Sequence, residues 1–286
     1  MQHDATHIKR LVSELRPASA VPQIFTHDTL DSTNDEAARL LADPAIAAPL
    51  VVIARRQTKG RGRLGRPWLS EPNGNLYISF GFRPRVAPPR LQTLTLWAGV
   101  TLCDFLAARI MGGREGKGSA APAIKWPNDI FFGPRKAGGM LAEARAAAGN
   151  IDSLVFGLGL NLKPPAAGWP PELAATATSL AEQPGGELAD PNAFVAGLIA
   201  RVLNACDQLL ANPAATSVSL AALWQKYDLL RGKTITILSG NERLTGDADG
   251  IDSEGSLVLK MTGANTQKIR AGDVTIEKKP NREIPF

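Results

Sequence analysis

The sequence predicts an α+β protein: a mixed, mainly antiparallel sheet backed by helices, followed by a small β-barrel. Residues 75–83 (NLYISFGFR) alternate large apolar residues with Tyr, Ser and Gly, which is the two-residue period of a half-buried strand. Residues 91–110 are apolar almost all round, which predicts a long buried helix. After Leu230 the helical pattern gives way to short strands between Gly and Asp turns, which predicts a separate β module over residues 231–280.

The N-terminal extension, residues 1–23, carries apolar residues at helical spacing between Ile8 and Leu15. This spacing predicts a short helix that ends before Pro17. We expect one large domain to occupy residues 24–230 and a tail to follow at residues 281–286.

Within the large domain, Thr33 and Glu36 have the spacing of a capping box at the start of a helix. The other expected elements are a strand at 50–57, a flexible loop at 111–123, a strand broken at Pro127, two strands in RKAGGMLAEARA and DSLVFGLGLNL, a long irregular Pro/Gly/Ala-rich connection, a helix starting at Asp190 and a short helix around Trp224.

Composition limits the classes of function. The chain has 286 residues, 44% hydrophobic and 21% charged, with a net charge of +5 and a pI near 9.4, which suits an anionic substrate better than a nucleic-acid coat. Cys103 and Cys206 lie in apolar helical patterns and are expected to be reduced core thiols, with no metal-binding spacing. The sequence shows no secretory signal, and no run approaches the roughly 18 apolar residues of a membrane span, so we expect a cytoplasmic protein.

The stretch KGRGRLGRPW at residues 59–68 places four cations among three glycines. Arginine forks grip phosphate or carboxylate, and glycines let the backbone approach a ligand closely. The GxGxxG match within it is not a dinucleotide fingerprint, because a Pro-Trp pair and a turn follow where that fold needs a helix. Kinase and P-loop partners are also missing from the sequence.

Four motifs occur in order: DSTN at 31–34, QTKGRGRLGRPW at 57–68, KWPND at 125–129 and GLGLNL at 157–162. Together they resemble the motifs of biotin–protein ligases, which attach biotin to lysines of carrier proteins. The resemblance runs from about residue 28 to residue 277 and includes RKAGGMLAE. It implies a class II synthetase-like catalytic domain with an SH3-like C-terminal module, of the monofunctional type without an N-terminal DNA-binding domain.

The resemblance implies an acyl-adenylate reaction. Biotin's carboxylate attacks the α-phosphate of ATP, pyrophosphate leaves, and a carrier lysine then attacks the mixed anhydride. Cations and Mg²⁺ must offset the repulsion between the two anions, and no covalent nucleophile is needed. The implied carrier is a biotin carboxyl carrier protein such as that of acetyl-CoA carboxylase.

Site residues follow from the resemblance. The biotin site would contain Ser32, Thr33, Asn34, Gln57, Arg61, Gly62, Arg63, Lys125 and Gly139. The ATP site would contain Arg63, Arg66, Trp68, Asn128 and Asn161. Lys125 would be the main catalytic cation, with Arg61 and Arg63 in a loop that closes over the intermediate. Asp129 would assist the metal or the incoming lysine.

Each of these residues has an ordinary structural explanation as well. Thr33 would be a helix cap, Asn128 and Asp129 a turn, Trp68 a core residue and the Arg/Gly run a solvated loop; only the joint pattern favours function. A lipoate or octanoate ligase and a biotin-sensing regulator are the alternatives. We expect no specific DNA binding, because about 23 residues before the body are too few for a helix-turn-helix domain. Exposed edge strands permit a homodimer.

Overall fold

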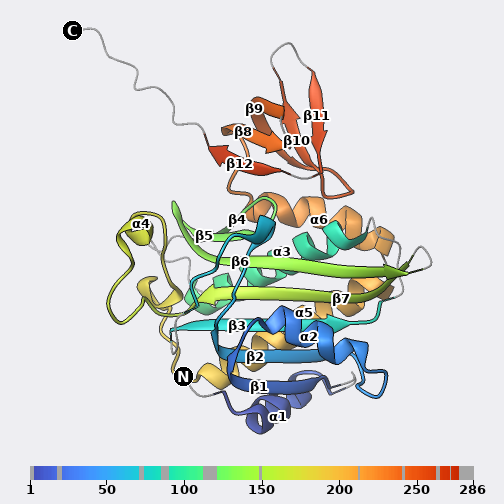
Figure 1. Cartoon of the computed structure of the whole chain (residues 1–286). Coiled ribbons are helices and arrows are strands. Elements are labelled where there is room, and N and C mark those ends of the chain that lie inside the picture. Colours follow the sequence, from blue (N-terminus) through green and yellow to red (C-terminus); the bar gives the residue numbers. More distant parts are fainter. Residues whose placement is uncertain are drawn as a thin grey trace.

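The computed structural model describes residues 3–17, 21–70, 74–84, 90–111, 121–147, 150–211, 213–239, 242–261, 265–270 and 272–276 (Figure 1). Most of the predicted 111–123 loop and the 281–286 tail lie outside these ranges. A seven-stranded sheet has the order β1-β2-β3-β7-β6-β5-β4. Its β1–β2 pair is parallel and its other pairs are antiparallel, which confirms the predicted mixed, mainly antiparallel sheet.

The strands of the large sheet are β1 (Gln23–Leu30), β2 (Leu50–Gln57), β3 (Asn75–Phe82), β4 (Pro122–Lys125), β5 (Asp129–Phe132), β6 (Arg135–Ala147) and β7 (Asn150–Asn161). The sequence did not predict β1. This strand lies at the sheet edge and none of its residues is buried, so it lacks the apolar alternation that marks a strand in sequence.

The helices are α1 (Ala5–Leu15), α2 (Thr33–Ala42), α3 (Arg90–Met111), α4 (Pro171–Ala174), α5 (Pro191–Ala211) and α6 (Pro213–Tyr227). In Figure 1, α3, α5 and α6 lie behind the large sheet and α2 lies in front. Asp190 caps α5 by accepting from Ala193 N at 3.0 Å, as its sequence predicts. The connection after β7 is mostly irregular, as predicted, although the one-turn α4 and a 3-10 turn at Leu180–Glu182 interrupt it.

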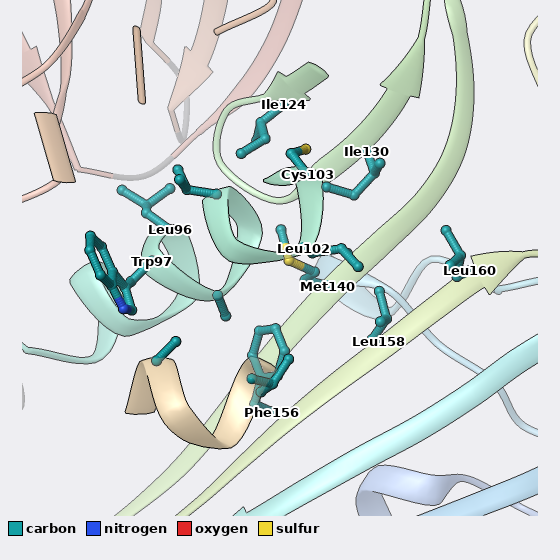
Figure 2. Packing of buried hydrophobic residues seen from close by; sticks show 14 of the residues in the cluster. Leu96, Trp97, Leu102, Cys103, Ile124, Ile130, Met140, Phe156, Leu158 and Leu160 are labelled. Atoms are coloured by element: carbon teal, nitrogen blue, oxygen red, sulfur yellow. The ribbon is translucent and has the colours of Figure 1, made fainter. Parts of the chain in front are cut away.

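The predicted alternation of β3 determines which face of the sheet is the core. Leu76, Ile78, Phe80 and Phe82 all belong to the large buried cluster on the α3 side. Figure 2 shows Met140 of β6 and Phe156 and Leu158 of β7 in the same cluster with Leu102 of α3. The opposite face of β3 and β7 therefore presents the intervening residues, which include Ser79, Gly157 and Gly159 as well as Val155, part of a second buried cluster with α2.

Helix α3 contains a window, Thr93–Ile110, that is long and apolar enough for a membrane span, contrary to the expectation from sequence. Within the protein 61% of this window is buried, since α3 packs against the sheet and against α5 and α6. The window therefore has the character of a core helix. Cys103 on α3 and Cys206 on α5 are free and buried, as predicted.

The C-terminal strands β8 (Thr234–Ser239), β9 (Glu242–Ile251), β10 (Leu257–Lys260), β11 (Thr266–Ile269) and β12 (Asp273–Ile276) form a five-stranded sheet. The predicted β module is present, but the barrel is not closed: in the described residues β11 and β12 are opposite edges, and no ladder joins them. Trp126, only 1% exposed, donates its indole N–H to the Gly255 carbonyl at 3.1 Å and so links the two sheets.

Candidate active site

A cavity of about 690 Å³ lies between the start of α2, the loop after β2, the glycine-bearing strands β6 and β7, and strand β12. Every site residue named from the sequence lines it: Ser32, Thr33, Asn34, Gln57, Arg61, Gly62, Arg63, Arg66, Trp68, Lys125, Asn128, Asp129, Gly139 and Asn161. The structure therefore brings together four motifs that lie between residues 31 and 162 of the chain.

Strand register places several of these residues in one row across the sheet. Lys125 pairs with Asp129, Asp129 with Gly139, and Gly139 with Gly159, whose other partner is Tyr77. Side chains at paired positions point to the same face of a sheet. The row therefore carries charge on β4 and β5 and a bare glycine floor on β6 and β7.

The first turn of α2 also lines the cavity. Ser32 is the N-cap: its backbone is extended (φ −153°), and its Oγ accepts from Asp35 N at 3.4 Å. The predicted capping box of Thr33 and Glu36 is therefore wrong, because Thr33 is already the first helical residue. Glu36 instead pairs with Arg39 on the surface of the helix.

Thr33 does not cap the helix and takes part in a buried hydrogen-bond network. Its backbone N–H and its hydroxyl both donate to Gln57 Oε1, at 2.8 and 3.1 Å. Ser79 of β3 is completely buried, and its Oγ lies 2.8 Å from Thr33 Oγ1 and 2.6 Å from Asn34 Oδ1. The start of α2 is thus fixed to β2 and β3 through neutral polar groups that border the cavity.

Residues 59–68, here termed the arginine loop, form a narrow hairpin. Trp68 N donates to Gly60 O at 2.9 Å, and Gly62 N donates to Arg66 O at 2.8 Å. The tip residue Leu64 has a φ of 56° and is 77% exposed. The base of the loop is therefore hydrogen-bonded while its tip projects into solvent.

Each arginine of the loop is held by a different part of the protein. Arg61 forms a two-bond ion pair with Asp35, 2.7 Å on each side, and a second pair with Glu143 at 3.0 Å. The hydrogen bond to Asp35 is the largest cause of the raised pKa of Arg61, against partial desolvation. Arg63 donates to Gly272 O at 3.3 Å, and Arg66 pairs with Asp273 of β12.

Trp68 covers the glycine floor. A Cβ added to Gly159 would stand 2.8 Å from Trp68 Cε2, and one added to Gly139 would stand 3.3 Å from Trp68 Cζ3. The Trp68 indole N–H is buried and has no hydrogen-bond partner in the described residues. An aromatic ring with an unused donor therefore borders the cavity.

Lys136 is a cavity residue that the sequence analysis did not single out. Its Nζ lies 2.8 Å from Asp129 Oδ1 and 5.2 Å from the centre of the Trp68 ring. Burial lowers the pKa of Lys125 below the ordinary lysine range; the nearby cations Lys136 and Arg66 add to this, and Asp129 and Asp273 oppose it. Two lysines thus face one carboxylate.

The two asparagines of the predicted nucleotide site use their amide donors within the protein. Asn128 Nδ2 donates to Met140 O at 2.8 Å, and Asn161 Nδ2 donates to Thr178 O at 3.0 Å. These bonds aim the amides and leave each side-chain carbonyl for a ligand. The cavity wall also includes Trp169, Leu173 and Thr176 of the connection after β7, and no sequence motif marks these residues.

The chain was compared with known proteins. A model described as the Biotin/lipoate A/B protein ligase family matches residues 27–161, and one described as Biotin protein ligase C terminal domain matches residues 231–276. The Biotin–[acetyl-CoA-carboxylase] ligase of Mycobacterium tuberculosis is 32% identical over 254 residues, 86% of this chain and 87% of that protein. The Bifunctional ligase/repressor BirA of Bacillus subtilis is 32% identical over 254 residues, 88% of this chain and 74% of that protein.

Solved structures of biotin protein ligases have the same fold as this chain. The biotin protein ligase from Aquifex aeolicus in complex with biotin and ATP has a TM-score of 0.69 and 25% identity, over 90% of this chain and 99% of that one. Fold, cavity and C-terminal module define a protein ligase of the biotin/lipoate class. Within that class, the chain belongs to the biotin protein ligase family.

Proposed function

We propose that the chain activates biotin with ATP as biotinyl-5′-AMP and transfers the biotinyl group to a lysine of a biotin carboxyl carrier protein. The arrangement of polar groups along the glycine floor carries this proposal. Neutral groups of Ser32, Thr33 and Gln57 gather beside β2 and β3, whereas Lys125 and Lys136 stand on β4 and β6. Biotin has a neutral ureido ring at one end and a carboxylate at the other, and the two groups of residues match these two ends.

Two displacements make up the reaction. A carboxylate oxygen of biotin forms a bond to the α-phosphorus of ATP, and the bond to the leaving pyrophosphate breaks. The amine of the carrier lysine then attacks the acyl carbon, loses a proton and releases AMP. Lys125, Lys136 and Arg63 provide fixed positive charge where the anions meet, which lowers the barrier by electrostatic stabilisation and positioning.

Magnesium suits the oxygen groups beside the lysines. Mg²⁺ is usually held by one or two protein carboxylates together with substrate phosphates. Asp129 supplies a carboxylate, and the side-chain carbonyl of Asn128 accepts no hydrogen bond from the described residues, while its amide N–H donates to Met140 O. These two residues would hold the ion with the ATP phosphates, where it would supply additional neutralisation of phosphate charge.

Biotin-dependent exchange of labelled pyrophosphate into ATP is the direct test, because it reports the first displacement without a carrier. We expect exchange with biotin and little exchange with lipoate or octanoate. Exchange with lipoate or octanoate in preference to biotin would assign the chain to the other branch of the ligase class. Absence of exchange with all three acids would contradict an adenylating function.

The remaining expectations concern partners. We infer that the carrier is that of acetyl-CoA carboxylase, in line with the names of two relatives, and that the reaction takes place in the cytoplasm. Residues 5–15 form a single helix whose Ile8 and Val12 are buried, so this helix packs into the core. A gel shift with and without biotin tests DNA binding. Light scattering over a range of protein concentrations tests whether two chains form a dimer through the edge strand β1.

A further inference from the structure

One carboxylate behind the cavity wall connects two residues of the ligand site. Glu143 of β6 accepts from Asn34 Nδ2 at 2.6 Å, and its two oxygens lie 3.0 and 3.1 Å from Nη2 of Arg61. Asn34 and Arg61 line the cavity. We infer that Glu143 is a positioning residue that fixes the start of α2 and the base of the arginine loop relative to each other. The inference rests on the proposed function for its effect on biotin.

The side-chain amide of Asn34 forms its hydrogen bonds within the protein. Its Oδ1 lies 2.6 Å from Ser79 Oγ, and its Nδ2 donates to Glu143 and approaches Leu141 O at 3.4 Å. An amide has two N–H donors, and both are in use. Asn34 therefore acts by holding the first turn of α2 in place.

The guanidinium of Arg61 is similarly engaged. Asp35 and Glu143 bring two negative charges against its single positive charge, and the side chain of Arg61 is 30% exposed. A guanidinium that is already neutralised on two sides attracts phosphate weakly. Arg61 is therefore the anchor of the loop, and the phosphate-facing charge comes from Arg63, which among the described residues donates to the Gly272 carbonyl and not to a carboxylate.

The position of Glu143 follows from strand register. Glu143 lies two residues after Leu141, so both side chains are on the same face of β6. The strand partner of Leu141 is Gly157, where an added Cβ would lie 2.1 Å from Asn34 Oδ1. The missing side chain at Gly157 thus creates the space in which the Asn34 amide reaches Glu143.

The test compares Glu143→Gln and Glu143→Ala with the wild-type chain. Glu254→Gln is the matched control, because Glu254 forms an ion pair of 2.8 Å with Arg270 in the C-terminal sheet and does not line the cavity. Trypsin cleavage after the loop arginines is measured without ligands, and KM for biotin and kcat are measured by pyrophosphate exchange. Circular dichroism and thermal unfolding check that each variant is folded.

For Glu143→Gln we expect faster cleavage in the arginine loop and a roughly tenfold higher KM for biotin, equivalent to about 1.4 kcal/mol, with a smaller change in kcat. Glu143→Ala should show a larger effect, and Glu254→Gln none. An unchanged KM for biotin in folded Glu143→Gln would overturn the inference. The wild-type chain could show no exchange while Glu143→Gln still speeds trypsin cleavage in the arginine loop. That result would contradict the proposed function and support the positioning role of Glu143.

Discussion

The indole of Trp68 lies directly on the backbone of Gly159, where an added Cβ would approach its Cε2 and Nε1 atoms to 2.8 Å. The cross-strand partner Gly139 extends the same floor under Cζ3 of the ring. Lys136 Nζ lies 5.2 Å from the centre of the same ring. The two glycines are thus explained by the aromatic ring that covers them.

Gly159→Ala should displace this ring. Overpacking a filled site typically costs about 1–3 kcal/mol, and we expect thermal unfolding to show a loss in that range. KM for ATP should rise more than KM for biotin, because the displaced ring belongs to the predicted nucleotide site. Gly74→Ala is the control: its Cβ would meet Lys163 O at an ordinary 3.5 Å. Equal stability and an unchanged KM for ATP in Gly159→Ala would contradict the role of this contact.

Lys125→Ala should lower biotin-dependent pyrophosphate exchange by about 10²–10³-fold while the fold is retained, because a preorganised charge near the reacting phosphate is lost. We expect Lys136→Ala to have an effect of the same order, since both lysines face Asp129. Lys226→Ala, an exposed lysine paired with Asp104, serves as the control. Normal exchange in Lys125→Ala would remove Lys125 from the catalytic group.

The pH dependence of kcat/KM should reveal the burial of Lys125. Burial favours the neutral amine, so the pKa of Lys125 is lowered and its positive charge is lost at a lower pH than for an ordinary lysine. Exchange should therefore decline on the alkaline side below the ordinary lysine pKa. Lys125→Arg keeps the charge at high pH and should move this decline upward. The same alkaline profile in wild type and Lys125→Arg would assign the decline to another group.

Arg63→Gly should weaken retention of the activated intermediate. In the described part of the chain Arg63 donates to the Gly272 carbonyl, at 3.3 Å, and forms no ion pair, so its guanidinium is available to a phosphate. Rapid filtration of labelled adenylate should show faster release from the variant, with the thermal unfolding midpoint preserved. Arg109→Gly, which removes a bond from a partly exposed arginine to the Glu187 carbonyl, should leave release unchanged. A wild-type release rate in Arg63→Gly would rule out the retention role.

Local pattern was sufficient wherever one strand or one helix decides the outcome. The alternation in residues 75–83 predicted the buried face of β3, and Asp190-Pro191 predicted the start of α5. It failed at β1, whose edge position leaves no buried residue, and at Thr33, where the cap moved to Ser32. The two failures have different causes: the edge position of β1 removes the apolar alternation, whereas Ser32 and Thr33 are adjacent residues that both suit a helix N-cap.

The sequence by itself determined the motifs, the strand period and the glycines, because these depend on side-chain type and spacing along one segment. Tertiary structure decided which charges meet. Glu143 is 82 residues from Arg61, and Asp273 is 207 residues from Arg66, yet each pair is in contact. Lys136 entered the site through its contact with Asp129 across β5 and β6. Such pairings arise from strand register and from the packing of the two sheets, so no local pattern contains them.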